Sequence, residues 1–166
     1  LVDTSKLEVA NLNVNANLTL NFADSAKNTA SLQKITLNNN ANLNINSWDF
    51  GNTTAFSSNG GGRVTFENAT YTQNGTPKTI SADSTISGVL SLSNVGKAQT
   101  TQSTTPNIST DTRFESLKFE NKNLSFGEDS KISVSFDSSV KKGESSIKTG
   151  DYYKLISAGT ITDNRT

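Results

Sequence analysis

The residues of this chain that could do acid–base chemistry are its carboxylates, which are scattered along the whole length. A stack of repeats could bring together a pair such as Asp49 and Glu67, but the spacing selects no pair suited to general acid and general base work. The chain contains no His and no Cys, the usual bases, nucleophiles and soft metal ligands. We therefore expect a protein that is not an enzyme, with no catalytic residues, no bound cofactor and no metal site.

Two features could instead make contact with a partner. Trp48 follows a short polar run at the end of a repeat, where we expect a partly exposed ring that could serve recognition. Residues 97–107 (KAQTTQSTTPN) contain no apolar side chain larger than alanine, which predicts an extruded loop or a break between two stacks. The candidate interaction residues in this stretch are Gln99, Thr100, Thr101 and Gln102.

The charge balance excludes several classes of partner. Lys and Arg together number 15, as do Asp and Glu, so the net charge is zero and no basic stripe is available for nucleic acid or anionic lipid. The sequence has no apolar run long enough to span a membrane as a helix. These properties favour a protein surface, a glycan or a second copy of the chain as the partner.

An internal repeat indicates the elements that must carry these residues. The run LNVNANLTL from Leu12 to Leu20 matches LNNNANLNI from Leu37 to Ile45, an offset of 25 residues. Apolar and small polar residues alternate strictly from Leu12 to Phe22, which is typical of a half-buried β-strand. Because such repeats bury their apolar face only by stacking on one another, the pattern predicts an all-β solenoid.

The stacking can be predicted in some detail. Leu18 and Leu20 should lie in inward columns with Leu43 and Ile45, and the later pair Val64/Phe66 followed by Leu90/Leu92 predicts coils of roughly 20–26 residues. Asn39 replaces an apolar residue of the first repeat, so it lies either at a corner or buried with hydrogen-bond partners. A change in the phase of alternation predicts a bend near residues 10–11.

Two sequence features resemble the passenger domains of bacterial autotransporters. One is the Asn-rich alternation over residues 12–22 and 35–50, with Val64-Thr65-Phe66-Glu67-Asn68 after it. The other is the segment from Gly150 to Gly159, GDYYKLISAG, which is similar to the G-x-x-Y-x-L-I-x-A segments of such passengers. Within that class the chain most resembles the vacuolating cytotoxin and its toxin-like outer-membrane relatives.

This resemblance implies a fold, a location and a role. It implies a right-handed parallel β-helix, with residues 1–166 as one β-helical fragment of a larger passenger that is secreted through a barrel outside this fragment. The expected location is the bacterial surface or the extracellular space. The expected role is non-enzymatic contact with a receptor or glycan of a host cell, or self-association. Two alternatives stay open: a carbohydrate-binding or carbohydrate-active β-helix of the tailspike kind, and a purely structural spacer.

Overall fold

The structure is a computed structural model in which residues 8–22, 31–50, 55–58, 61–72, 77–96, 114–138, 140 and 153–166 are described. These residues are mostly β-strand, with nearly no helix, so the prediction of an all-β protein is confirmed. The strands are β1 (Glu8–Val14), β2 (Leu18–Asn21), β3 (Ser31–Leu37), β4 (Asn42–Asn46), β5 (Ala55–Ser58), β6 (Arg63–Glu67), β7 (Thr70–Thr72), β8 (Lys78–Ile80), β9 (Asp83–Ser87), β10 (Val89–Val95), β11 (Leu117–Phe126), β12 (Lys131–Phe136) and β13 (Ile156–Asp163).

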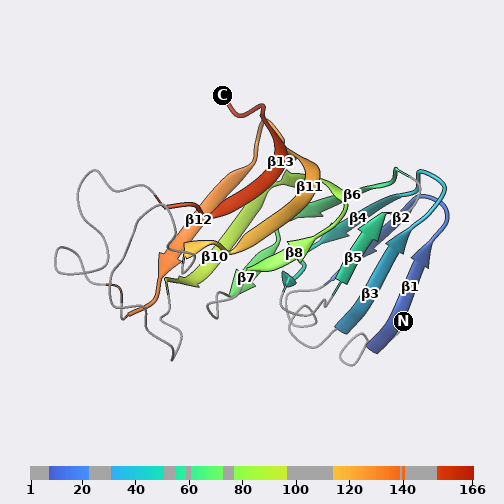
Figure 1. Cartoon of the computed structure of the whole chain (residues 1–166), viewed down its shortest axis with the longest axis horizontal. Helices are drawn as coiled ribbons and strands as arrows, with labels where there is room; N and C mark the ends of the chain where they lie inside the picture. The colour runs from blue at the N-terminus through green and yellow to red at the C-terminus, as the bar shows by residue number, and fades with distance from the viewer. Residues whose placement is uncertain are drawn as a thin grey trace.

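The strands form three sheets (Figure 1). Sheet A has the order β1-β3-β5, and sheet C has the order β12-β10-β7. Sheet B has the order β13-β11-β9-β6-β4-β2, with β8 paired to β11 as its seventh strand. Strand pairing within all three sheets is parallel. Successive repeats along the chain therefore add strands to the sheets in a recurring order, as β3-β4 follows β1-β2 and β9-β10 follows β6-β7.

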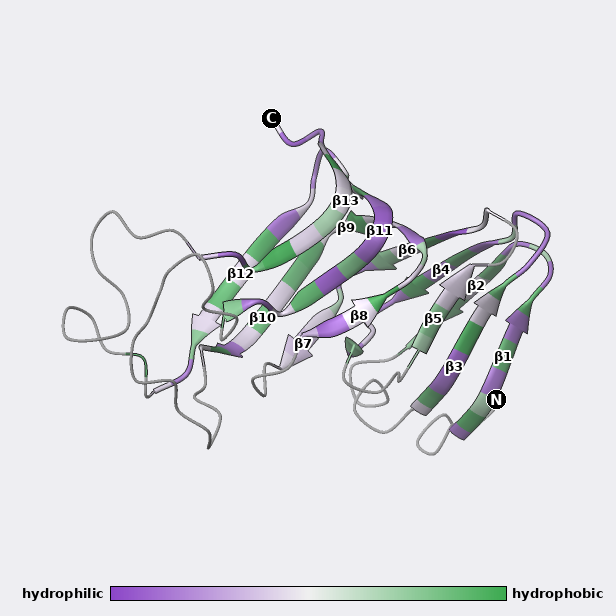
Figure 2. Cartoon of the chain, in the orientation of Figure 1, coloured by the Kyte–Doolittle hydropathy of each residue, from purple (hydrophilic) through white to green (hydrophobic). Residues whose placement is uncertain are grey.

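The predicted inward columns are confirmed in sheet B. Leu18 pairs with Leu43 and Leu20 with Ile45. Leu43 and Ile45 are fully buried, and the two leucines of edge strand β2 are partly buried against the same core. The alternation that produces this burial is visible along the strands (Figure 2), where hydrophobic and hydrophilic residues follow one another.

Sheet B continues these two columns through the later repeats, and sheet A forms another. One column of sheet B runs Leu18, Leu43, Val64, Ser84, Leu124 and Ile161, and its neighbour runs Leu20, Ile45, Phe66, Ile86, Phe126 and Asp163. In sheet A, Leu12 stacks on Ile35 and Ile35 on Phe56. Each column buries its side chains between neighbouring strands, and the columns also meet across the core, where the rings of Phe56 in sheet A and Phe66 in sheet B lie 5.4 Å apart.

The first part of the repeat is offset by 23 residues, and only the second part by 25. Leu12 pairs with Ile35, although the repeated letters suggested Leu37 as its equivalent. The difference is the pair Asn39 and Asn40, which the second repeat inserts at the turn between its two strands with φ angles of 53° and 57°. Asn39 is exposed at this turn, which confirms the corner and excludes the buried alternative.

The phase change near residue 10 is also present. Ala10 and Asn11 are successive exposed residues within β1, and Gln33 and Lys34 occupy the same place in β3. Since one extra outward residue reverses the alternation, the side chains on either side of this point can all face the core.

The prediction that Val64 stacks on Leu90 is wrong. Val64 pairs with Ser84, and Leu90 lies in sheet C, where it pairs with Ile132. Ser84 escapes recognition as a core position because it is polar, yet it is 1% exposed and its Oγ donates to the carbonyl oxygen of Ala82 at 2.9 Å. The next step in the column, from Ser84 to Leu124, spans 40 residues. The predicted coil length therefore fails at this step.

Candidate interaction surfaces

Trp48 does not provide the exposed ring that the sequence suggested. Its side chain is fully buried, and its ring lies 5.0 Å from that of Phe22. Ser47, at φ 58°, turns the chain from sheet B toward sheet C, and the following residue then faces the core. The next repeat places Ala69 at the equivalent position, where its small side chain leaves room for the indole. The indole Nε1 has no hydrogen-bond partner among the protein atoms.

The other predicted contact residues, Gln99, Thr100, Thr101 and Gln102, lie outside the described residues, as does the whole stretch 97–107. The described residues on either side of the undescribed stretch 97–113 are Gly96 and Phe114. Gly96 follows β10, and Phe114 precedes β11 and is fully buried. A Cβ atom at Gly96 would lie 2.7 Å from the ring of Phe114, so the two ends of the insertion are in contact.

A second undescribed stretch begins and ends at the same place. Val140 precedes residues 141–152, and Tyr153 follows them. The side chain of Val140 would lie 2.7 Å from a Cβ atom at Gly96, and the rings of Tyr153 and Phe114 are 4.1 Å apart. Phe136, which is 50% exposed, packs edge-on to Phe114 at 6.4 Å.

We call these five residues, Gly96, Phe114, Phe136, Val140 and Tyr153, the insertion root. The sequence does not predict this cluster, because its five residues are spread from position 96 to position 153. The available signal was that Phe114 and Tyr153 stand directly beside stretches that lack the strand alternation.

The carboxylates of the described residues are dispersed over the sheets. Asp49 forms a bridge with Thr70 beside sheet C, whereas Glu67 pairs with Asn46 and Ser87 in sheet B, so strand pairing does not bring Asp49 and Glu67 together. Among the described residues no three His, Cys, Asp or Glu side chains gather to hold a metal ion.

Asp49 instead acts on a tyrosine and a lysine. Burial, and then the negative charge of Asp49, raises the pKa of the Tyr71 hydroxyl. Burial lowers the pKa of the Lys78 ammonium, and the charge of Asp49 partly offsets that effect.

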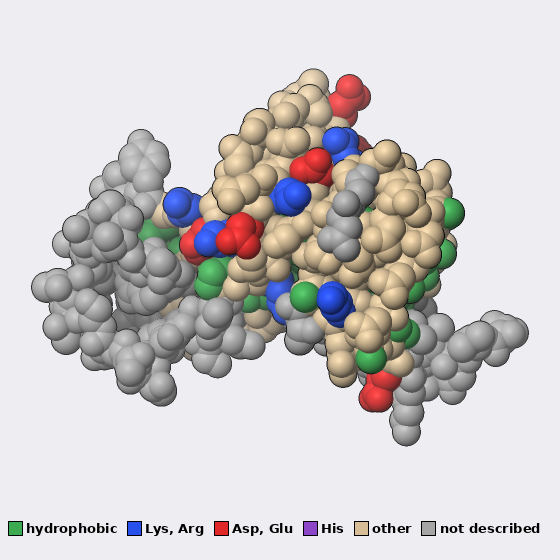
Figure 3. Space-filling view, turned by 45° about the vertical axis from the view of Figure 1, so that its right-hand side comes forward, with side chains coloured by type: hydrophobic (Ala, Val, Ile, Leu, Met, Phe, Trp, Pro, Cys, Tyr) green, Lys and Arg blue, Asp and Glu red, His purple; other side chains and the backbone are tan. Residues whose placement is uncertain are grey.

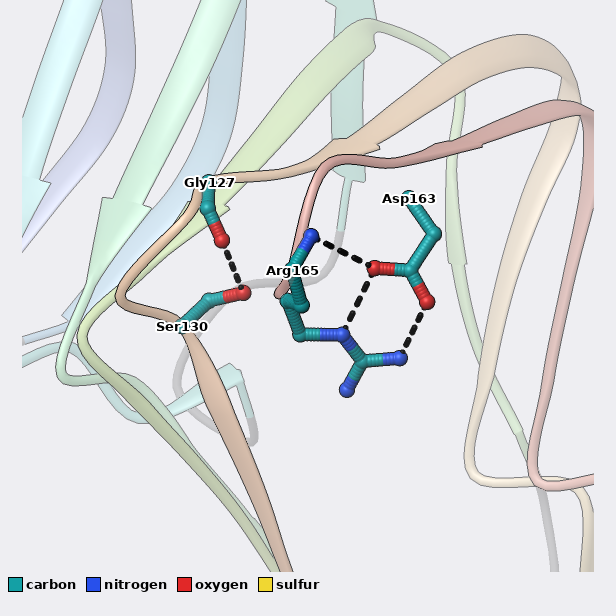
Figure 4. A network of polar contacts seen from close by, with 4 residues as sticks. All are labelled: Gly127, Ser130, Asp163 and Arg165. Atoms are coloured by element: carbon teal, nitrogen blue, oxygen red, sulfur yellow. Dashed lines mark hydrogen bonds and ion pairs between the residues drawn. The ribbon is translucent and has the colours of Figure 1, made fainter.

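One ion pair lies at the end of an inward column of sheet B. Asp163 occupies the position after Phe126, and Arg165 binds its carboxylate through Nε at 2.7 Å and through a second guanidinium nitrogen (Figure 4). The guanidinium carbon of Arg165 lies 4.8 Å from the centre of the Phe126 ring. The nearby turn is held by Ser130, whose hydroxyl donates to the carbonyl of Gly127 at 2.7 Å. The pair therefore covers an aromatic side chain that this position would otherwise leave open.

Comparison with known proteins adds no assignment. The chain matches no family model, and neither a curated protein nor a solved structure shows significant similarity to it. No helix among the described residues has the length and apolar character needed to cross a membrane. Inference about function therefore rests on the residues and their arrangement.

Proposed function

We propose that this chain is a β-helical segment of a secreted or surface-exposed bacterial passenger protein of the autotransporter, vacuolating-cytotoxin-like type. In this proposal sheets A, B and C are the three faces of a right-handed parallel β-helix. The recurring order in which the chain adds strands to the sheets supports it, as does the parallel pairing throughout. A β-helix buries its parallel sheets around its own interior, which accounts for the columns of apolar side chains.

The proposed role is non-enzymatic contact with a host cell or with another copy of the protein. The single observation that carries it is the insertion root, where two stretches, 97–113 and 141–152, leave a rigid β scaffold from one aromatic cluster. Binding residues are concentrated on loops that a rigid scaffold positions.

Binding to epithelial cells tests this role directly. The purified chain is compared with a variant lacking residues 97–107 and with the control E128A/D129A, which changes an exposed turn between β11 and β12. We expect the deletion to lower cell binding or self-association, while the control leaves both unchanged. If the intact chain neither binds cells nor self-associates at micromolar concentration, the spacer alternative replaces this proposal.

The proposed location and the proposed lack of enzymatic activity have separate tests. Antibody labelling of intact bacteria should detect the protein at the cell surface, and labelling only after lysis would contradict export. Incubation with polysaccharides should release no sugar. Release that a single Asp or Glu substitution abolishes would show an enzyme.

A further inference from the structure

The outward face of sheet B is a regular array of hydroxyl and amide side chains. Its central column is made by the residues that alternate with the inward apolar ones. By strand register this column runs Thr19, Asn44, Thr65, Thr85, Ser125 and Thr162. The column therefore crosses six strands without a charged or a large apolar side chain.

Two flanking columns extend the array along the strands. One runs Asn42, Arg63, Asp83, Asn123 and Thr160, and the other runs Asn21, Asn46, Glu67 and Ser87. Arg63 and Asp83 are neighbours of opposite charge. The only net charge over the three columns is that of Glu67.

Charged side chains also lie outside the array. Lys118 and Glu120 project from the first half of β11, where it pairs with β8, and Lys34 projects from β3. Figure 3 shows one face of the molecule, on which Lys, Arg, Asp and Glu side chains form small groups among uncharged ones. The central column of the array differs from these positions because it carries no charged residue.

The spacing of the array suits an extended polymer of hydroxyl groups. Adjacent strands of a sheet lie about 4.8 Å apart, and outward residues on one strand recur about every 6.7 Å. The strand spacing is close to the length of one sugar ring in an extended polysaccharide. A glycan laid across the strands could therefore repeat its hydrogen bonds from one strand to the next.

Asn44 supplies a second observation at the centre of the array. Its Oδ1 atom is buried and has no hydrogen-bond partner, although Asn44 lies between Thr19 and Thr65 on the outward face. A buried carbonyl oxygen without a donor is unfavourable by about 1–3 kcal/mol. Rotation of the Asn44 amide toward a bound hydroxyl group would satisfy it.

We propose that the outward face of sheet B binds a linear, neutral, β-linked polysaccharide whose chain runs across the strands. An anionic glycan or a nucleic acid would find no net positive charge on this face, because Asp83 balances Arg63 and Glu67 adds a negative charge. This proposal concerns a different surface from the insertion root and does not depend on the role proposed for that cluster.

Affinity electrophoresis in gels containing polysaccharide tests the inference. The probes are hydroxyethylcellulose and mixed-linkage β-glucan as neutral β-linked chains, dextran as an α-linked chain, and alginate as an anionic chain. The main variant is T65V/T85V, which removes two hydroxyl groups while keeping side-chain shape. The matched control is T72V, an exposed threonine on β7 of sheet C. Circular dichroism confirms that each variant is folded, and T85R serves as a second variant that obstructs the face with a bulky charge.

We expect the β-linked neutral polymers to retard the intact chain and T72V, and T65V/T85V to bind about tenfold more weakly. T85R should bind at least as weakly as the double valine variant. Three results would overturn the inference: no retardation by either β-linked polymer, equal retardation of all variants, or preferential retardation by alginate. Loss of self-association in T65V/T85V without any glycan binding would assign the face to a second copy of the chain instead.

Discussion

At the scale of single residues, left-handed backbone positions direct the chain from one sheet to the next. Ser47, Asn68 and Gly88 have φ angles of 58°, 52° and 63° at successive corners between sheets B and C. Asn68 also connects the corners, since its side-chain Nδ2 donates to Asn46 Oδ1 and its side-chain Oδ1 accepts from the backbone N–H of Val89. Asparagine suits this place because it tolerates a positive φ and bonds locally.

This arrangement predicts different outcomes for two substitutions of Asn68. N68A loses both side-chain hydrogen bonds and introduces alanine, which disfavours a positive φ. The free energy of unfolding should therefore fall by about 2–3 kcal/mol. N68G loses the same bonds but removes the backbone strain, so its loss should be about 1 kcal/mol smaller. Urea denaturation of both variants measures the difference. Equal stability of N68A and the unsubstituted chain would contradict the role of this corner.

The ion pair at Asp163 predicts a pH dependence. Hydrogen bonds from the Arg165 side chain, and then from its backbone, lower the pKa of the Asp163 carboxyl from 3.8 to about 2. A lowered pKa in the folded state means that the pair stabilises the fold above pH 3.8, and that this contribution is lost as the pH falls toward 2. The contribution is small because the carboxyl is exposed to solvent.

An NMR titration of the Asp163 carboxyl measures this pKa directly. The variant R165A should return it toward 3.8, and the variant K131A is a control because Lys131 lies on β12 and has no part in the pair. A carboxyl that titrates near 3.8 in the unsubstituted chain would show that the pair does not form in solution.

At the scale of elements, the strength of a strand depends on its place in the stack. Leu43 lies on β4, with β2 on one side and β6 on the other, and is 1% exposed. Leu18 occupies the same column on β2, the last strand of sheet B, and is only partly buried. The same side chain therefore has two neighbouring strands at one position and one at the other.

Comparison of L43A with L18A measures how much the second neighbouring strand contributes to the stability of the column. L43A should lower the free energy of unfolding by about 2–5 kcal/mol, because it leaves a cavity in a packed column. L18A should lower it by less, since part of the leucine already contacts water. Urea denaturation of the two variants under identical conditions gives the comparison. A larger loss for L18A would mean that the column does not continue as described.

The strands of the first two repeats could be predicted from the sequence because their alternation is nearly pure. Three points could not be predicted in the same way. The residues Asn39 and Asn40 change the register by two without disturbing the alternation on either side. Ser84 occupies an inward column as a polar residue that bonds locally. The direction of Trp48 depends on a single φ angle at Ser47, which a residue pattern does not specify.

The candidate site was less predictable than the fold. The contact residues suggested around residues 99–102 lie outside the described part of the chain, and the exposed ring expected at Trp48 is buried. The insertion root is made by residues distant in sequence, such as Gly96 and Tyr153, whose proximity follows only from the stacking of whole repeats. The array on sheet B likewise needs the strand register, because each strand contributes only one residue to each column.

At the scale of the whole molecule, the same stacking that forms the core also positions the surfaces. The inward columns of sheet B fix the register of six strands, and this register aligns the residues of the outward array. The insertion root is fixed by β10, β11 and β12, which belong to two different sheets. A chain of this kind can therefore vary its insertions while the repeats keep the places from which they emerge.

Packing in the insertion root should affect both the stability of the fold and the binding of the protein to cells. F114A should lower the free energy of unfolding by about 3–5 kcal/mol, because Phe114 is fully buried between Gly96, Val140 and Tyr153. F136A should lower it much less, since that ring is 50% exposed and touches the cluster at its edge. Urea denaturation measures both losses, and the cell-binding assay is then run at a temperature where both variants are folded. If the root orders the contact surface, F114A should bind cells more weakly than F136A. Equal binding by the two folded variants would show that the insertions act independently of their aromatic anchor.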